Sequence, residues 1–167
     1  MELFKHFTVE CERTYHIGIK ICGLKQYIEI FEGSVCYIIE HYLDNLKHGL
    51  SYVFLNNGDD NRFLKRVITY KHGKRNGIEL NWKSSGDLYA KESYLDDKKH
   101  GTYYFWHFHS NTLHCVSNYS HELLNGKQIM YYENGNLREK TYYKNGVLRS
   151  AINYKLDGSL AQKTKYY

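Results

Sequence analysis

The sequence predicts an all-β fold, an elongated array of antiparallel β-hairpins in a single layer. The first observation behind this prediction is a leucine followed six residues later by a tyrosine, a pair that recurs about every 24 residues. The pairs are Leu64 with Tyr70, Leu88 with Tyr94, Leu113 with Tyr119, Leu137 with Tyr143, and Leu160 with Tyr166. Repetition at a period of roughly 20 to 50 residues is typical of arrays whose units bury apolar side chains by stacking on their neighbours.

The second observation is that apolar and polar residues alternate on both sides of a short turn in each unit. Residues 126–132 alternate, residues 133–136 read Glu-Asn-Gly-Asn, and residues 137–143 alternate again. Alternation is the period of a β-strand, and a short connection containing Asn-Gly between two such runs indicates a hairpin. Residues 77–94 repeat the pattern around a turn at 84–87.

The other elements follow along the chain. We expect residues 1–22 to form an amino-terminal cap and residues 23–167 to form the repeat domain, with about six units of which the first is degenerate. The unit that begins at Gly49 has a longer connection, so we expect a longer hairpin loop there. Four units begin with a glycine, which we call the leading glycine; these are Gly49, Gly77, Gly101 and Gly126. Arg149 replaces the leading glycine of the last unit, and Asn111 replaces the turn glycine of the unit that begins at Gly101.

Two positions of each first strand carry large side chains. Because alternate residues of a strand lie on one face, we expect these side chains and the leucine–tyrosine pairs to form one packed ladder between units. Counted from the leading glycine, the third and fifth positions hold Tyr52 and Phe54, Leu80 and Trp82, Tyr104 and Trp106, and Ile129 and Tyr131. The alternative is a row of rings on which a ligand stacks.

The opposite face of the first strands varies between units and suggests a binding surface in two of them. The side chains at this surface are Tyr103, Phe105, His107, Met130 and Tyr132. Exposed apolar patches tend to mark interfaces, and aromatic residues are enriched at interface hot spots. We predict that these residues bind a protein, and the alternative is that the cap or a twist of the sheet covers them.

Basic residues recur on the second strands, on the face opposite the leucines. We expect Lys65, Lys91, Lys140 and Lys163, with Arg138 beside them, to form a row. With two strand spacings per hairpin, neighbouring ammonium groups would lie about 10 Å apart. Such a row could follow a polyanion or an anionic lipid surface. The alternative is a solvated face that prevents the sheet from pairing with another sheet.

Composition and charge narrow the classes of function. The net charge of +5 permits an acidic protein or an anionic lipid surface as partner, and we do not expect nucleic acid. The cysteines lack the spacing of a disulfide or metal framework, which indicates a reducing compartment. No apolar run approaches the roughly 18 residues of a membrane-spanning helix, and the charged first residues do not resemble a signal peptide. We therefore expect a cytoplasmic protein without a transmembrane segment.

The motifs of catalysis are missing from the sequence. It has no Gly-x-Ser-x-Gly, no cysteine–histidine arrangement with known spacing and no phosphate-binding glycine loop. His107 and His109 lie two residues apart, and two histidines on one strand face could hold a divalent metal. A third ligand is not evident. The prediction is a protein without enzymatic activity, metal or cofactor.

The stretch from Asn125 to Leu137, continued by Tyr142 to Gly146, resembles the MORN (membrane occupation and recognition nexus) repeat. It is most similar to the longer variant found in bacterial proteins labelled antitoxins and in proteins of large DNA viruses. The resemblance covers about residues 23–167. It implies an open solenoid of successive hairpins that serves as a scaffold or interaction module, and some members of the family are proposed to contact phospholipid. It supplies no catalytic residue.

These observations predict a non-enzymatic repeat scaffold that mediates protein–protein interaction. Self-association is one form of this function, because a terminal hairpin has unpaired backbone groups at its edge. A virion-associated role would follow if the source is a large DNA virus. Two alternatives stay open, namely binding of an anionic phospholipid or polyanion through the lysine row and antitoxin-like neutralisation of a partner protein.

Overall fold

The computed structural model describes most of the chain, and it describes side chains from Tyr37 onward. The residues that it does not describe are 1–2, 7–12, 22–23, 33–35, 57–61 and 167. The chain divides into two compact parts, each with several repeats. We call residues 1–87 the first unit and residues 88–167 the second unit. The described residues form no helix, and so none that is long and apolar enough to cross a membrane.

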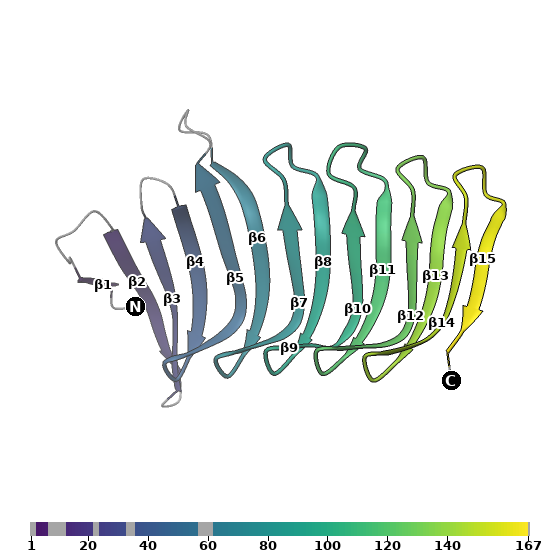
Figure 1. Ribbon diagram of the computed structural model, residues 1–167. Coiled ribbons are helices and arrows are strands. Elements are labelled where there is room, and N and C mark those ends of the chain that lie inside the picture. Colours follow the sequence, from purple (N-terminus) through teal and green to yellow (C-terminus); the bar gives the residue numbers. More distant parts are fainter. Residues whose placement is uncertain (1–2, 7–12, 22–23, 33–35, 57–61, 167) are drawn as a thin grey trace. The chain divides into compact units, whose positions relative to one another are not determined.

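The first unit is an antiparallel sheet in which each strand pairs with the strand that follows it in the chain (Figure 1). Its strands are β1 (Leu3–His6), β2 (Arg13–Ile21), β3 (Leu24–Glu32), β4 (Cys36–Leu43), β5 (Leu46–Asn56), β6 (Arg62–Lys71) and β7 (Lys74–Trp82). The cap expected over residues 1–22 therefore contains strands, and its boundary with the repeats stays a prediction. The longer loop expected after Gly49 falls largely on residues 57–61, which lie outside the described residues.

The second unit is also antiparallel, and β8 pairs with both β9 and β10. Its strands are β8 (Leu88–Leu95), β9 (Lys98–Lys99), β10 (Gly101–Trp106), β11 (Leu113–Ser120), β12 (Leu123–Tyr131), β13 (Leu137–Lys144), β14 (Val147–Tyr154) and β15 (Leu160–Lys165). From β10 to β15, each strand pairs with the next. The predicted fold class is confirmed, since the described residues form successive antiparallel hairpins in an open sheet.

One end of each hairpin in the second unit is closed by a residue with positive φ. Gly135 has a φ of 85°, and its N–H donates to the carbonyl of Tyr132 at 2.9 Å. Asn111 replaces this glycine in the preceding hairpin, takes a φ of 55° and donates to the carbonyl of His107 at 3.2 Å. Asparagine is among the few residues other than glycine that adopt this conformation readily. The hairpin thus closes with Asn111 in place of glycine, through a hydrogen bond between residues four apart instead of three.

The other strand ends are joined by two-residue turns in which both residues have positive φ. This is the type I′ turn, whose twist matches that of the strands it connects. The turns are Asp44–Asn45, His72–Gly73, Asp96–Asp97, His121–Glu122 and Asn145–Gly146. His121 and Glu122 adopt φ values of 49° and 73° without help from a glycine, because strand pairing on both sides holds them there.

The leading glycines lie where the pairing shifts register. Gly77 has a φ of 122°, and a Cβ atom there would lie 3.1 Å from the side chain of Thr69. The pairing of β6 with β7 shifts at this point, between Ile68 and Tyr70. Arg149, at the equivalent position of the last hairpin, is not among the residues with positive φ. The last hairpin thus forms without the glycine conformation.

A second register shift, inside each hairpin, decides which residues share a face. In the hairpin of β12 and β13, Ile129 pairs with Lys140, whereas Tyr131 pairs with Leu137. The extra residue is Arg138, and the shift is therefore a β-bulge. The bulge moves the leucine to the face of Ile129 and Tyr131, and it leaves Tyr143 on the opposite face.

We name the two faces of each unit by repeat position. Face A carries the second and fourth positions after the leading glycine and the tyrosine of each leucine–tyrosine pair. Face B carries the third and fifth positions and the leucines. The expectation of one ladder holding all these residues is therefore wrong. The buried strand residues lie on face A and are Glu40, Ser51, Ile68, Glu79 and Asn81 in the first unit and Ala90, Tyr94, Cys115, Ser117, Thr141 and Ala151 in the second.

Candidate functional site

The predicted protein-binding residues lie around β11 on face A of the second unit. Phe105 of β10 and Met130 of β12 both pair with Cys115 of β11. Tyr103 pairs with Ser117, two residues further along β11. Because paired residues of neighbouring strands share a face, the structure brings Tyr103, Phe105 and Met130 together.

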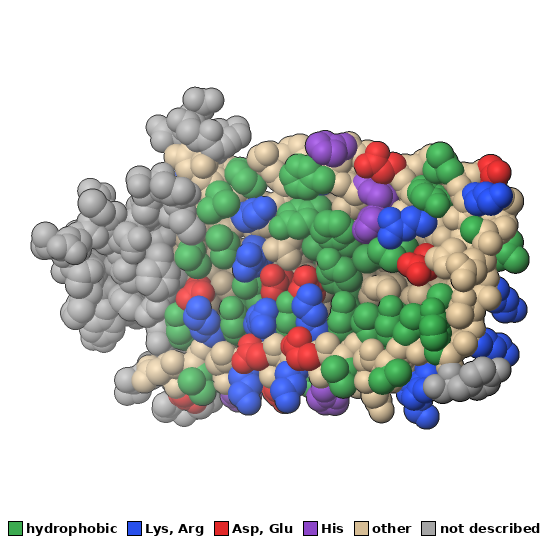
Figure 2. Space-filling model, viewed as in Figure 1, with side chains coloured by type: hydrophobic (Ala, Val, Ile, Leu, Met, Phe, Trp, Pro, Cys, Tyr) green, Lys and Arg blue, Asp and Glu red, His purple; other side chains and the backbone are tan. Residues whose placement is uncertain are grey.

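Aromatic contacts extend this group toward β8 and the loop that follows β10. The rings of Tyr103 and Phe105 stack with centroids 6.2 Å apart and 15° between planes. Tyr89 packs edge-on against Phe105 at 6.2 Å and against Phe108 at 6.3 Å. Phe108 is 60% exposed. We call Tyr89, Tyr103, Phe105, Phe108 and Met130 the apolar patch, and Figure 2 shows hydrophobic side chains gathered over β8 to β12.

Sequence reasoning missed Tyr89, Phe108 and His114. Tyr89 and His114 each follow the leucine of a second strand directly, where the bulge turns the side chain to face A against Phe105. Both positions depend on the bulge, which forms only between paired strands, so no signal in the second strand alone identified them. Phe108 lies in a loop, where no periodic pattern places a side chain.

His107 and His114 form the border of the patch near the hairpin loop. Nε2 of His107 lies 3.1 Å from the carbonyl of Tyr131 and 3.1 Å from Nδ1 of His114. A carbonyl only accepts, so Nε2 of His107 donates and Nδ1 of His114 is left as an acceptor. Burial, with His107 and Arg138 nearby, lowers the pKa of His114 below its usual value. His114 is therefore neutral at pH 7.

The expectation that His107 and His109 share a strand face is wrong. Strand β10 ends at Trp106, and both histidines follow it outside the strand. Within the described part of the chain, no three His, Cys, Asp or Glu side chains are grouped to hold a metal ion.

Arg138 borders the patch toward the last hairpin, and Tyr132 directly follows β12. The hydroxyl of Tyr132 donates to the carbonyl of Tyr154 at 2.9 Å. Nη2 of Arg138 lies 3.2 Å from Sδ of Met130. Arg138 was expected in the lysine row, but its position at the bulge places it against the patch on face A instead.

Polar groups beneath the patch are paired. Ser117 is 1% exposed, and its Oγ accepts a hydrogen bond from Nε2 of Gln128 at 2.9 Å. Oε1 of Gln128 in turn accepts from Oγ1 of Thr141 at 3.4 Å. Burial raises the pKa of the Tyr103 hydroxyl and of the Cys115 thiol, so both stay protonated at pH 7. A protonated thiol is a poor nucleophile, and Cys115 therefore acts as an apolar side chain here.

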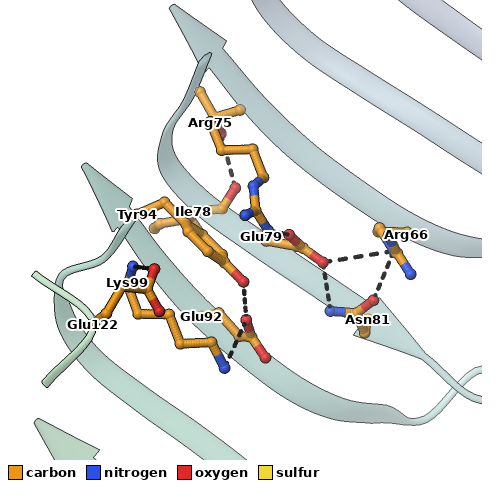
Figure 3. Close-up of polar contacts among 10 residues, drawn as sticks. Arg66, Arg75, Ile78, Glu79, Asn81, Glu92, Tyr94, Lys99 and Glu122 are labelled. Atoms are coloured by element: carbon orange, nitrogen blue, oxygen red, sulfur yellow. Dashed lines mark hydrogen bonds and ion pairs between the residues drawn. The ribbon is translucent and has the colours of Figure 1, made fainter. Parts of the chain in front are cut away.

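The equivalent face of the first unit holds charged side chains in place of rings. Glu79 lies 3.5 Å from Nε of Arg66 and 3.6 Å from Nη1 of Arg75 (Figure 3). Asn81 accepts from Arg66 at 3.0 Å and donates to Glu79 at 3.3 Å. Figure 2 shows acidic and basic side chains side by side over β4 to β7.

A similar group stands on β4 and β5. The carboxylate of Glu40 accepts from Nζ of Lys47 at 2.6 Å, from Tyr42 at 2.7 Å and from Ser51 at 3.3 Å. Nζ of Lys47 also lies 5.4 Å from the ring centroid of Tyr70, within the range of a cation–π contact.

Among the described residues of the second unit, a similar arrangement lies at the margin of the patch. The hydroxyl of Tyr94 donates to Glu92, and Nζ of Lys99 lies 3.5 Å from Glu92 (Figure 3). Lys99 also lies 5.1 Å from the ring centroid of Tyr103 and 5.7 Å from that of Tyr119. Further along β10 to β12, uncharged residues occupy the equivalent positions.

The expected lysine row differs from the structure in two ways. Lys91 pairs with Tyr104, and its Nζ lies 5.7 Å from that ring, so the lysines share face B with the large apolar side chains instead of lying opposite them. Lys140 lies 5.8 Å from the ring of Tyr154 in the same way. Lys65 is the bulge residue of its hairpin, and its Nζ donates to the carbonyl of Trp82 at 3.3 Å. An evenly spaced row is therefore not formed.

The comparisons with known proteins give a match in the second unit, over a stretch that includes Met130 of the patch. Residues 124–145 and 138–156 match the family model of the MORN repeat variant. These stretches cover β12 to β14 with their connecting turns. No curated protein matches the chain. The resemblance seen in the sequence is confirmed, and the chain carries repeats of the MORN variant family, shown over residues 124–156.

Proposed function

We propose that this chain is a non-enzymatic repeat scaffold that binds a protein partner through the apolar patch of its second unit. The observation that carries the proposal is the replacement of a paired ion network by partly exposed rings at equivalent positions of face A. MORN repeats are generally non-catalytic binding repeats, which agrees with a scaffold. The protonated Cys115 and the absence of a catalytic motif also favour binding over catalysis.

The chemistry of the patch suits a protein surface. Its rings are held in place by edge-on and stacked contacts, so little side-chain entropy is lost when a partner covers them. Charged groups surround it, with Lys99 on one side, Arg138 on another and Glu133 near the hairpin loop. An apolar centre with a polar border is the usual anatomy of a protein interface.

The test is a cross-linking pull-down that compares the intact chain with Phe105→Asp. The carboxylate would sit at the centre of the patch, and we expect recovery of the specific partner to fall at least tenfold. Tyr142→Asp is the matched control, because it makes the same kind of change at an exposed ring on face B. Circular dichroism and thermal melting confirm that both variants fold. Equal recovery with Phe105→Asp and with the intact chain would exclude the patch.

The partner that covers the patch could be a second copy of this chain or a toxin-like protein that the chain neutralises. Sedimentation velocity distinguishes the first case, since a dimer that dissociates in Phe105→Asp but not in Tyr142→Asp identifies a second copy as the occupant of the patch. Neutralisation would instead appear as a heteromeric complex with the same sensitivity to Phe105→Asp.

A further inference from the structure

A hollow of about 300 Å³ opens on the sheet of β12, β13 and β14. Its lining includes the face B residues Lys127, Lys140, Tyr142, Ser150, Ile129 and Ile152, together with Gln128 and Thr141. Ser150 is the smallest of these side chains, and it lies between larger neighbours. This face is opposite the apolar patch, so the hollow is not part of the proposed protein-binding site.

Two more lysines lie on β15, the strand next to the residues that line the hollow. Lys165 pairs with Ser150, and Lys163 pairs with Ile152. Lys127 pairs with Tyr142 on the other side, and Lys140 lies between Ile129 and Ile152. We call Lys127, Lys140, Lys163 and Lys165, with Tyr142 and Ser150, the lysine hollow. Strands β12 and β15 are three strand spacings apart, so the backbones of Lys127 and Lys165 lie about 15 Å from one another.

The positive charge of the lysine hollow is not neutralised by nearby carboxylates. Face B of β12 to β15 has no Asp or Glu, since Glu139 lies on face A and the nearest other acids, Glu133 and Asp157, are in hairpin loops. None of the four lysines belongs to an ion pair found among the described residues. All four side chains are exposed. The potential over the hollow is therefore positive and attracts anions.

From this geometry we propose that the lysine hollow binds a compact ligand carrying several phosphate groups. Lysine binds phosphate as a point charge with three donors, and a group of four lysines matches a ligand with several negative charges. The hydroxyls of Ser150 and Tyr142 supply further donors to phosphate oxygens.

The test is isothermal titration calorimetry of the full chain with sodium tripolyphosphate at low ionic strength. Binding is expected, with an affinity that falls steeply as salt is added. Lys140→Gln combined with Lys163→Gln should weaken binding at least tenfold. Lys91→Gln combined with Lys98→Gln removes the same net charge from β8 and β9, outside the hollow, and should change the affinity less than threefold.

Several outcomes would overturn the proposal. One is an equal loss of affinity in both double variants, which would mean that the affinity for tripolyphosphate depends only on the net charge of the protein. Another is binding to vesicles that contain a phosphorylated inositol lipid without any binding of free tripolyphosphate, which would place the phosphate source on a membrane surface. Binding of inorganic sulfate as tightly as tripolyphosphate would remove the requirement for several clustered phosphates.

Discussion

Face A of the two units provides different chemistry on equivalent backbone positions. In the first unit, the second and fourth positions after the leading glycines Gly49 and Gly77 hold Ser51, Val53, Glu79 and Asn81. In the second unit, after Gly101 and Gly126, they hold Tyr103, Phe105, Gln128 and Met130. The first set is tied together by Glu40, Lys47, Arg66 and Arg75 through ion pairs and hydrogen bonds. The second set is tied together by ring stacking and neutral amide and hydroxyl groups.

This difference shows that the backbone of the repeated hairpins determines where a side chain points, whereas the type of side chain at that position can differ between repeats. The type I′ turns, the glycine-assisted register shift and the bulge occur in both units. The charged network pairs its carboxylates with cations, and Oε2 of Glu79 lies 3.6 Å from Arg75 without a hydrogen bond. Such paired charges gain little from a partner, whereas partly exposed rings gain from being covered. The patch therefore marks the second unit as the binding unit in our proposal.

The largest loss of stability should come from replacing a leading glycine of the hairpin backbone. Gly77→Ala forces a positive φ on alanine and brings its Cβ within 3.1 Å of Thr69, whose hydroxyl bonds the carbonyl of Ile78. We expect a loss of about 2 to 3 kcal/mol in the free energy of unfolding. Arg149→Ala, at the equivalent position of the second unit, should cost less than about 0.5 kcal/mol because no positive φ is required there. Urea unfolding measures both, and similar losses would contradict the different roles of the two positions.

A smaller effect is expected from breaking the ion network of the first unit. Glu79→Ala removes the partner of Arg66 and Arg75 and leaves Asn81 without an acceptor. We expect a loss of about 2 kcal/mol, below the usual cost for a fully buried pair because both arginines are partly exposed. Gln128→Ala, at the same repeat position, breaks only neutral hydrogen bonds and should cost about 1 kcal/mol. A loss for Gln128→Ala that exceeds the loss for Glu79→Ala would argue against an ion network that stabilises the first unit.

The ion pair of Arg75 and Glu79 can be transferred from the first unit to the second by two substitutions. Arg75 and Glu79 stand two residues before and two residues after a leading glycine, and Leu124 and Gln128 hold those positions around Gly126. Leu124→Arg and Gln128→Glu should each destabilise the chain. The double variant should be more stable than the sum of the single losses by about 0.5 to 1 kcal/mol, because a partly exposed pair forms. A double-mutant cycle that gives no coupling would show that the hairpin backbone alone does not transfer the network.

The smallest effect should be the pH dependence that His114 of the second unit gives to the stability of the fold. The pKa of His114 is lowered in the folded state, so the unfolded chain binds a proton more readily. The stabilisation is therefore complete above the unfolded pKa of about 6.5 and is lost as pH falls through the folded pKa. Lys65 occupies the equivalent position of the first unit, so that position holds no histidine there.

Melting temperatures between pH 5 and pH 8 measure this dependence. We expect the fall in melting temperature on acidification to be smaller in His114→Gln than in the intact chain. An unchanged pH profile in His114→Gln would show that the environment of this histidine does not couple to folding.

The hairpin architecture was predictable because its signals are local. The alternation around the Glu-Asn-Gly-Asn turn, the recurring leading glycines and the leucine–tyrosine spacing each report on a few neighbouring residues. The same signals identified the MORN-type repeat later matched over residues 124–156. Tyr103, Phe105 and Met130 were placed on one face correctly, because no register shift separates them from the leading glycine of their strand.

The sequence by itself determined a chain of antiparallel hairpins and the alternation of side chains within each first strand. Only the tertiary structure decided how the faces of first and second strands combine. The bulge after each leucine shifts the alternation by one residue, and it exists only in relation to a paired strand. That shift places Lys140 beside Ile129, Arg138 beside Met130 and the recurring tyrosines away from the leucines. The apolar patch and the lysine hollow are therefore properties of strand pairing, which no single segment of the sequence contains.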